Sequence, residues 1–209
     1  RSTLFPYTTL FRSRTGEIGK LWQSDRPVTA PGAHGYLQSI VQKIIATNDE
    51  LKKTDARVVF SRDWWPNAYS MGEGSIAINA GLMVFLDNEA ELVFVLCHEL
   101  AHYYLDHTAK GIKKYVETVN SEAFQKELKR LAKTEYGANK QLEELSKSFA
   151  FSSRRHNREN EVAADRLAFT FMKKTGYDCN AIKTGLELLD KVEDRKSTRL
   201  NSSHRTGSR

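Results

Sequence analysis

Apolar residues recur at helical spacing early in the chain and give way to short β-prone runs. From Pro31 onward the spacing predicts a helix that continues to about Lys53. Three runs rich in β-branched and aromatic residues follow, at 57–61, 67–71 and 75–79. A turn around Gly72 and Gly74 joins the last two runs. The first third of the chain therefore predicts one helix followed by three short strands.

The next segment predicts a helix that is buried on nearly every side. Asn88, with Glu91 three residues later, has the pattern of a helix start, and the following residues up to about Leu105 are mostly apolar. His98, Glu99 and His102 interrupt this apolar run. Because an unpaired polar or charged group is costly in a dry interior, these three side chains need a partner, and a metal ion would supply one.

The remainder of the chain is predicted to be helical. One or two amphipathic helices are expected between 113 and 150, another at 154–174 and a last one at 181–192. The order of one helix, a few short strands and then helices favours a single α+β domain. No run approaches the ~20 apolar residues that span a bilayer.

The chemistry of the chain centres on His98, Glu99 and His102. Residues four apart lie on one face of a helix, so the two imidazoles can bind the same ion. Glu99 lies at the edge of that face, where its carboxylate can reach a water molecule on the metal. Two histidines and a glutamate in this spacing form a known zinc metalloprotease motif.

A catalytic zinc needs a third protein ligand, and the segment 159–165 offers carboxylates for it. Glu161 and Asp165 share one helix face at four-residue spacing. One of them can bind the metal while the other accepts the outer N–H of a ligand histidine. The small residues Ala163 and Ala164 would let this helix approach the first closely.

The positive charge lies at the two ends of the chain. The formal net charge is +6, but eight of the 32 basic residues fall within 1–14 and 195–209, where there is no acidic residue. The other 24 basic residues are outnumbered by 26 acidic residues, which gives a net charge of −2 for 15–194. This balance argues against a basic nucleic-acid-binding module.

The two end segments also differ from the rest in character. The first lacks helix or strand periodicity, the second is polar and of low complexity, and both resemble translated sequencing-adaptor or vector sequence. The alternative is a pair of natural basic disordered tails. We expect non-native tails at 1–14 and 195–209 and a metallopeptidase domain at 15–194. The natural N-terminus is then expected to be missing, and any membrane association would come through missing segments.

Several motifs together resemble the gluzincin zinc metallopeptidases of the HtpX, BepA and CAAX-prenyl-protease type. They occur in the family's order between about 57 and 175. The matching segments are Asn67 to Tyr69, Gly74 to Leu82, Glu91 with Leu92, His98 to His102 with His107, and Glu161 to Asp165.

The resemblance implies a zinc-dependent endopeptidase with one Zn²⁺ per chain. It assigns His98, His102 and Glu161 as zinc ligands, Glu99 as the general base for a zinc-activated water, and Asp165 as a supporting acid. It also implies a gluzincin fold, extended or misfolded protein substrates, a role in protein quality control and a bacterial cell-envelope location.

The resemblance further implies that the substrate adds as a strand to an exposed sheet edge. The residues it assigns to that edge are Ser75, Ile76, Ala77, Ile78 and Asn79.

Some of these residues allow other interpretations. Glu159 could replace Glu161 as the ligand. His107 is predicted to be a surface or structural histidine, because a five-residue spacing rotates it off the metal face. Trp64 to Pro66 are predicted to pack near a strand entry, and the charged run at 113–147 to be a solvated helix face.

The competing function is a zinc-binding, chaperone-like protein of the same fold that lacks catalysis. It is disfavoured because Glu99 is present and three ligands leave a coordination position open.

Overall fold

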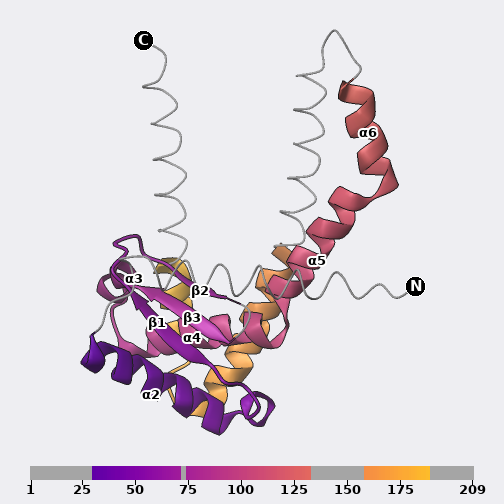
Figure 1. Cartoon of the computed structure of the whole chain (residues 1–209). Helices are drawn as coiled ribbons and strands as arrows, with labels where there is room; N and C mark the ends of the chain where they lie inside the picture. The colour runs from indigo at the N-terminus through magenta and orange to yellow at the C-terminus, as the bar shows by residue number, and fades with distance from the viewer. Residues whose placement is uncertain (1–29, 72–73, 133–157, 189–209) are drawn as a thin grey trace, which may run out of the picture.

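A three-stranded sheet covered by helices forms the body of the molecule (Figure 1). The computed structural model describes residues 30–71, 74–132 and 158–188. In chain order the elements are α2 (Pro31–Thr47), the 3-10 turn η1 (Asp49–Leu51), β1 (Arg57–Ser61), β2 (Ala68–Ser70), β3 (Ser75–Asn79), α3 (Ala80–Phe85), α4 (Glu89–Tyr104), α5 (His107–Asn120) and α6 (Glu122–Ala132). Residues 158–175 and 181–188 are also helical. The predicted α+β class with a small three-stranded sheet is confirmed.

The strand order is β1-β3-β2, so the last strand of the three lies in the middle. β1 pairs with β3 in parallel, with Arg57 opposite Ser75. β2 pairs with β3 antiparallel, with Ala68 opposite Ile78. The two free edges of the sheet therefore belong to β1 and β2.

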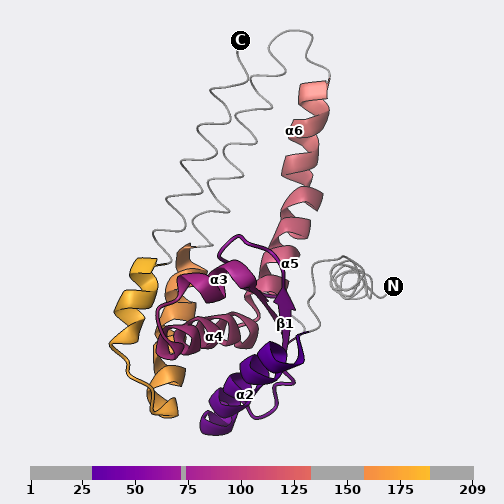
Figure 2. The same ribbon diagram turned by 90° about the vertical axis from the view of Figure 1, so that its left-hand side faces the viewer.

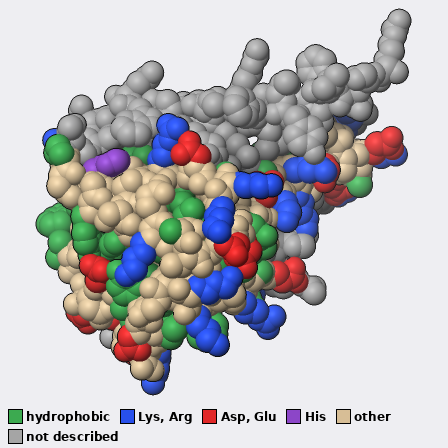
Figure 3. All heavy atoms as spheres, turned by 90° about the horizontal axis from the view of Figure 1, so that it is seen from below, with side chains coloured by type: hydrophobic (Ala, Val, Ile, Leu, Met, Phe, Trp, Pro, Cys, Tyr) green, Lys and Arg blue, Asp and Glu red, His purple; other side chains and the backbone are tan. Residues whose placement is uncertain are grey.

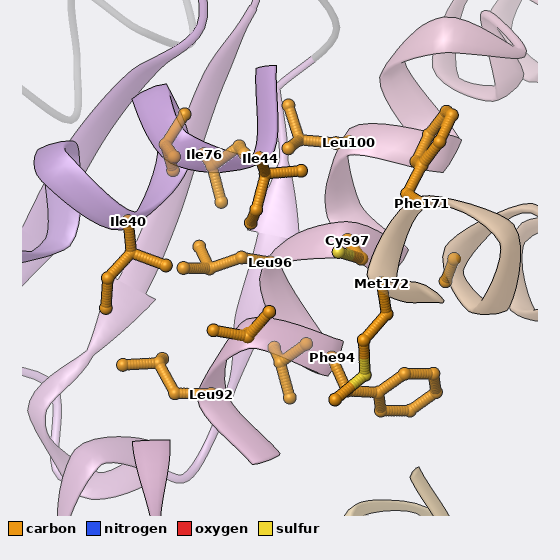
Figure 4. Close-up of a cluster of buried hydrophobic side chains, with 14 of the residues drawn as sticks. Ile40, Ile44, Ile76, Leu92, Phe94, Leu96, Cys97, Leu100, Phe171 and Met172 are labelled. Carbon is orange, nitrogen blue, oxygen red and sulfur yellow. The ribbon is translucent and has the colours of Figure 1, made fainter. Parts of the chain in front are cut away.

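One face of the sheet packs on α2 and α4, and this contact forms the main core. Figure 4 shows Ile44 of α2, Ile76 of β3 and Leu96 of α4 gathered in this layer, and all three are fully buried. On its other side α4 contacts the helix at 158–175, where Phe171 and Met172 are fully buried in the same cluster. Burying each such side chain stabilises the fold by about 1.5–3 kcal/mol. Because buried side chains contact α4 on both sides, the helix is fixed in place from two directions.

The helix α2 ends earlier than its sequence pattern predicts. It stops at Thr47 instead of about Lys53, and Asn48 takes an extended conformation. The buried Asn48 amide donates to the carbonyl oxygens of Ile44 at 2.8 Å and Phe171 at 3.2 Å. A side chain that bonds the backbone in this way competes with helix continuation, and here it also ties α2 to the helix at 158–175.

The start of α4 follows its prediction. Asn88 is the N-cap, and its Oδ1 accepts a hydrogen bond from the Glu91 N–H at 3.0 Å. The Glu91 carboxylate in turn accepts from the Asp87 N–H at 2.8 Å. This reciprocal capping fixes where the buried helix begins.

The helices α5 and α6 extend away from the sheet and its covering helices (Figures 1 and 2). They account for the first part of the predicted amphipathic region, and α5 has no buried side chain. The rest of that region, at 133–157, lies outside the described residues, as do the predicted tails at 1–14 and 195–209. None of the helices in the described ranges combines the length and the hydropathy needed to cross a membrane.

Basic and acidic side chains are interspersed on the face seen in Figure 3. Several of the described surface pairs are in contact, among them Lys52 with Asp49 at 2.5 Å and Lys174 with Glu50 at 2.8 Å. Exposed pairs of this kind contribute little to stability. They do balance the charge locally, in agreement with the near-neutral composition of 15–194.

The loop between β1 and β2 is fixed by its backbone and carries an exposed aromatic ring. Gly81 in α3 donates to the Asp63 carbonyl at 3.1 Å, and the Asn79 amide donates to the Trp65 carbonyl at 3.0 Å. The Trp64 side chain is nevertheless 72% exposed. The prediction that Trp64 to Pro66 pack near the strand entry is therefore wrong for the Trp64 ring, whereas Trp65 and Pro66 are partly buried.

Replacing Gly81 by alanine is expected to destabilise the protein by about 3 kcal/mol, since overpacking a rigid contact carries a cost of that order. A Cβ at this position would lie 2.0 Å from the Trp64 carbonyl oxygen, a backbone atom that cannot move aside alone. Gly35→Ala is the matched control, because a Cβ there meets nothing within 4 Å. It should stabilise α2 by about 0.5–1 kcal/mol. Urea unfolding followed by circular dichroism measures both, and similar unfolding free energies for the two variants would contradict the clash.

Candidate metal centre

The C-terminal half of α4 presents two imidazoles on one face. His98 and His102 are one turn apart, with ring centroids 4.6 Å from each other. Their side chains are only 14% and 16% exposed. Glu99, between them in sequence, is buried. The buried helix thus carries three polar groups where water has little access.

The carboxylate of Glu161 completes this cluster from the helix at 158–175. Its Oε2 lies 3.2 Å from His98 Nε2 and 3.4 Å from His102 Nε2, and the two Nε2 atoms are 3.0 Å apart. The structure therefore brings together the three residues that the resemblance assigns as ligands. The fully buried Ala164 and Ala168 on the inner face of this helix allow the close approach, whereas Ala163, predicted to help, is only partly buried.

The spacing of these three atoms suits a tetrahedral zinc site. Zinc binds imidazole nitrogen and carboxylate oxygen at about 2.0–2.1 Å, which places neighbouring tetrahedral ligand atoms about 3.3–3.4 Å apart. The observed separations of 3.0, 3.2 and 3.4 Å are close to this value. Two imidazoles and one carboxylate are also the donor set that suits zinc in hydrolases. The residues present fit the metal.

Asp165 supports the cluster from one turn further along the same helix as Glu161. Its Oδ1 lies 2.9 Å from His98 Nδ1. A carboxylate can only accept here, so the Nδ1 proton of His98 is the donor and Nε2 is directed into the cluster, where a bound metal would replace its proton. Glu161 and Asp165 thus have the complementary positions that their four-residue spacing allows.

The charges in this cluster favour a cation. Burial lowers the pKa of His98, but hydrogen bonds to Asp165 and Glu161 outweigh it and raise that pKa to about 10. Hydrogen bonds from His102 and His98 hold the pKa of Glu161 well below its usual range. The same carboxylates that stabilise a protonated imidazole would stabilise a divalent ion in its place.

Glu99 points to the sheet rather than joining the three ligand atoms. Burial raises the pKa of its carboxyl, the nearby His98 and His102 oppose this, and the Ser70 backbone N–H of β2 also lowers it. The carboxylate therefore lies next to the edge strand of the sheet. Glu99 is thus beside the cluster and beside β2 at the same time.

His107 contacts the cluster from behind. Its Nδ1 lies 3.0 Å from His102 Nδ1, on the side of the ring that faces away from Glu161. The sequence pattern predicted that His107 is rotated off the metal face, and His107 is indeed not one of the three clustered ligand residues. The pattern did not predict its contact with His102. The contact depends on a break in the helix at Leu105 and Asp106, which helical periodicity does not reveal.

The predicted substrate edge is in the wrong strand. Ser75, Ile76, Ala77, Ile78 and Asn79 form β3, which is paired on both sides and buried along most of its length. The main-chain groups of a central strand are used by its neighbours, so it cannot accept an added strand. The edge next to α4 belongs to β2, which contains the Ala68 and Tyr69 of the family motif.

The model of peptidase family M48, a family of zinc metallopeptidases, matches residues 31–205 of the chain. The match covers every described element and extends beyond residue 194, so the predicted domain boundary there stays a prediction.

Known proteases resemble the chain at low identity. The chain is 28% identical over 159 residues to the mitochondrial metalloendopeptidase OMA1 of Schizosaccharomyces pombe, covering 76% of the chain and 44% of that protein. It is 24% identical over 184 residues to the metalloprotease LoiP of Escherichia coli, covering 84% and 68%. It is 23% identical over 164 residues to the beta-barrel assembly-enhancing protease of Escherichia coli, covering 75% of the chain but only 33% of that protein. The chain thus spans about 33% to 68% of the length of these relatives.

Glu161→Gln is expected to weaken zinc binding by more than about 100-fold, because loss of a ligand should exceed the 10- to 100-fold effect of losing a supporting residue. Glu159→Gln is the matched control, since it removes the carboxylate that competed with Glu161 as the ligand. Zinc affinity measured by competition with a chromophoric chelator distinguishes them. A loss of zinc affinity in Glu159→Gln alone would identify Glu159, and not Glu161, as the third ligand.

Proposed function

The chain belongs to peptidase family M48, and from this premise we propose that it is a zinc-dependent endopeptidase. The observation that carries the proposal is the convergence of His98, His102 and Glu161 within 4.8 Å of one another on two packed helices. Three ligands leave one position of a tetrahedral site open, which distinguishes a catalytic from a structural zinc site.

The proposed metal is held by His98, His102 and Glu161. Bound there, zinc supplies a Lewis acid that polarises the scissile carbonyl and makes water nucleophilic at neutral pH. Asp165 keeps His98 in the tautomer whose Nε2 can bind. Burial of both histidines limits competing water and strengthens these interactions.

Glu99 is proposed as the general base. Its burial and raised pKa make its carboxylate a stronger base than an exposed glutamate. It accepts the proton of the attacking water and later delivers it to the leaving amine. The Ser70 N–H of the strand beside it favours the charged form of this carboxylate.

Glu99→Gln is expected to keep the zinc and lose the peptidase activity. A glutamine has nearly the same shape but cannot accept the proton, so kcat should fall by about 10²- to 10⁴-fold. Cleavage of casein, with zinc content measured on the same samples, tests this.

Glu159→Gln again serves as the control and should cleave at the wild-type rate. Equal cleavage by the wild type and Glu99→Gln would contradict the mechanism. Zinc binding without any cleavage by the wild type would favour the chaperone-like alternative.

We further propose that the substrate binds as an extended strand along β2. In the antiparallel β2–β3 pair, Met71 donates to the Ser75 carbonyl and Asn79 donates to the Asn67 carbonyl. The main-chain groups of alternate residues point in opposite directions, so those of Ala68 and Ser70 point away from β3. An added strand would use the outward N–H and carbonyl of Ala68 and the outward carbonyl of Ser70, while the Ser70 N–H lies next to Glu99.

The opposite edge of the sheet is less suited to a substrate. The Gln38 side chain of α2 accepts from the Val58 N–H at 3.0 Å and donates to the Ala56 carbonyl at 2.9 Å. It thereby occupies main-chain groups along the β1 edge, a common way of protecting an edge strand. The position of the catalytic groups and the protection of β1 both favour β2 as the substrate strand.

The substrate is proposed to be a protein, as the family implies, and strand addition would give it main-chain affinity with loose sequence preference. A cell-envelope location rests on the resemblance and on the relative named for beta-barrel assembly.

Ala68→Pro is expected to raise KM for protein substrates about 5- to 10-fold, the equivalent of one lost hydrogen bond of ~1–1.4 kcal/mol. Proline removes an N–H that faces the free edge and leaves the β2–β3 hydrogen bonds in place, since proline is tolerated on edge strands. Steady-state cleavage of a fluorescent peptide separates KM from kcat. Unchanged KM, with wild-type zinc content and thermal stability, would contradict substrate pairing at β2.

A further inference from the structure

His102 is contacted on both nitrogens of its ring, and the mechanism so far uses only one. Its Nε2 faces His98 and Glu161, while its Nδ1 lies 3.0 Å from the Nδ1 of His107. The two rings meet edge to face, with centroids 4.9 Å apart and planes inclined at 75°. His98 has a carboxylate in the equivalent outer position.

The backbone between the two histidines is shaped to make this contact. In a continuous helix, five residues rotate a side chain by about 140° from its starting direction, so His107 would point away from His102. The helix α4 ends at Tyr104, and Asp106 adopts a left-handed conformation with φ 54°. It is the one residue other than glycine with positive φ in the described ranges. The new helix α5 then starts at His107, with its ring turned back toward His102.

The chemistry of two facing Nδ1 atoms requires one donor and one acceptor. If His102 binds a metal through Nε2, its remaining proton must be on Nδ1. The Nδ1 of His107 is then the acceptor, and the proton of that ring is on Nε2. Each histidine of the cluster would thus donate its outer N–H to a specific partner, His98 to Asp165 and His102 to His107.

We propose that His107 is a positioning residue of the metal centre. It fixes the tautomer and the ring orientation of His102 and so directs the Nε2 lone pair at the ion. The proposal rests on the proposed function, because it requires that the cluster binds zinc. Supporting residues of this kind contribute about 10- to 100-fold to metal affinity.

A pair of substitutions separates the hydrogen bond from simple packing. His107→Leu removes the acceptor and should weaken zinc binding about 10- to 100-fold. His107→Asn can place its amide oxygen where Nδ1 was and should stay within about 3-fold of the wild type. His34→Asn, at an exposed position of α2, is the control for loss of a histidine and should have no effect. Zinc affinity by chelator competition is the measurement, with thermal unfolding of the zinc-free proteins as the check of folding.

The outcomes distinguish this inference from the proposed function. Wild-type affinity in His107→Leu, or equal loss in His107→Leu and His107→Asn, would overturn the acceptor role. Nitrogen-15 NMR of the zinc-loaded wild type provides a second readout, with the proton expected on Nδ1 of His102 and on Nε2 of His107. The reverse tautomer of His107 would overturn the proposal even if both variants failed to fold. Absence of zinc binding by the wild type would instead overturn the proposed function and this inference with it.

Discussion

The burial of α4 is the constraint on which the rest of the structure depends. This helix packs on the sheet and α2 on one side and on the helix at 158–175 on the other, yet its C-terminal half carries His98, Glu99 and His102. Polar groups in such surroundings are costly unless each has a partner. Glu161 and Asp165 have to come close to α4 for that reason, and Ala164 and Ala168 make the approach possible. The same packing that stabilises the fold therefore assembles the ligand cluster.

Much of the fold could be predicted from local patterns, because the signals concerned are local. The capped start of α4 depends on Asn88 and Glu91, three residues apart, and both the prediction and the structure place it there. The end of α2 could not be predicted in this way. It depends on a hydrogen bond from Asn48 to Phe171, a residue 123 positions away in the chain. Hydrophobic periodicity contains no information on a contact of that kind.

In the candidate site, too, the features set by local spacing could be predicted and those set by distant contacts could not. The spacing of His98 and His102 on one helix face follows from helix geometry, and the four-residue spacing of Glu161 and Asp165 does too. The strand order does not follow from spacing, and the substrate edge was therefore assigned to the wrong strand. A signal was present in the continuous apolar run Ile76 to Ile78, which is typical of a strand buried on both faces. His107 was missed because the left-handed Asp106 interrupts the periodicity on which the prediction relied.

The central position of β3 also explains why the open edge and the base lie together. β3 binds β1 on one side, where Gln38 of α2 covers the outer main-chain groups. On its other side it holds β2, a strand of three residues that lies against α4. The antiparallel register directs the Ser70 N–H away from β3 and toward the side of the Glu99 carboxylate, whose pKa it lowers. A polypeptide paired with β2 would thus have its backbone next to the base and to the ligand cluster without any further movement of the chain. If the proposed function holds, the register of this short edge strand, more than any single side chain, determines where a substrate would meet the metal.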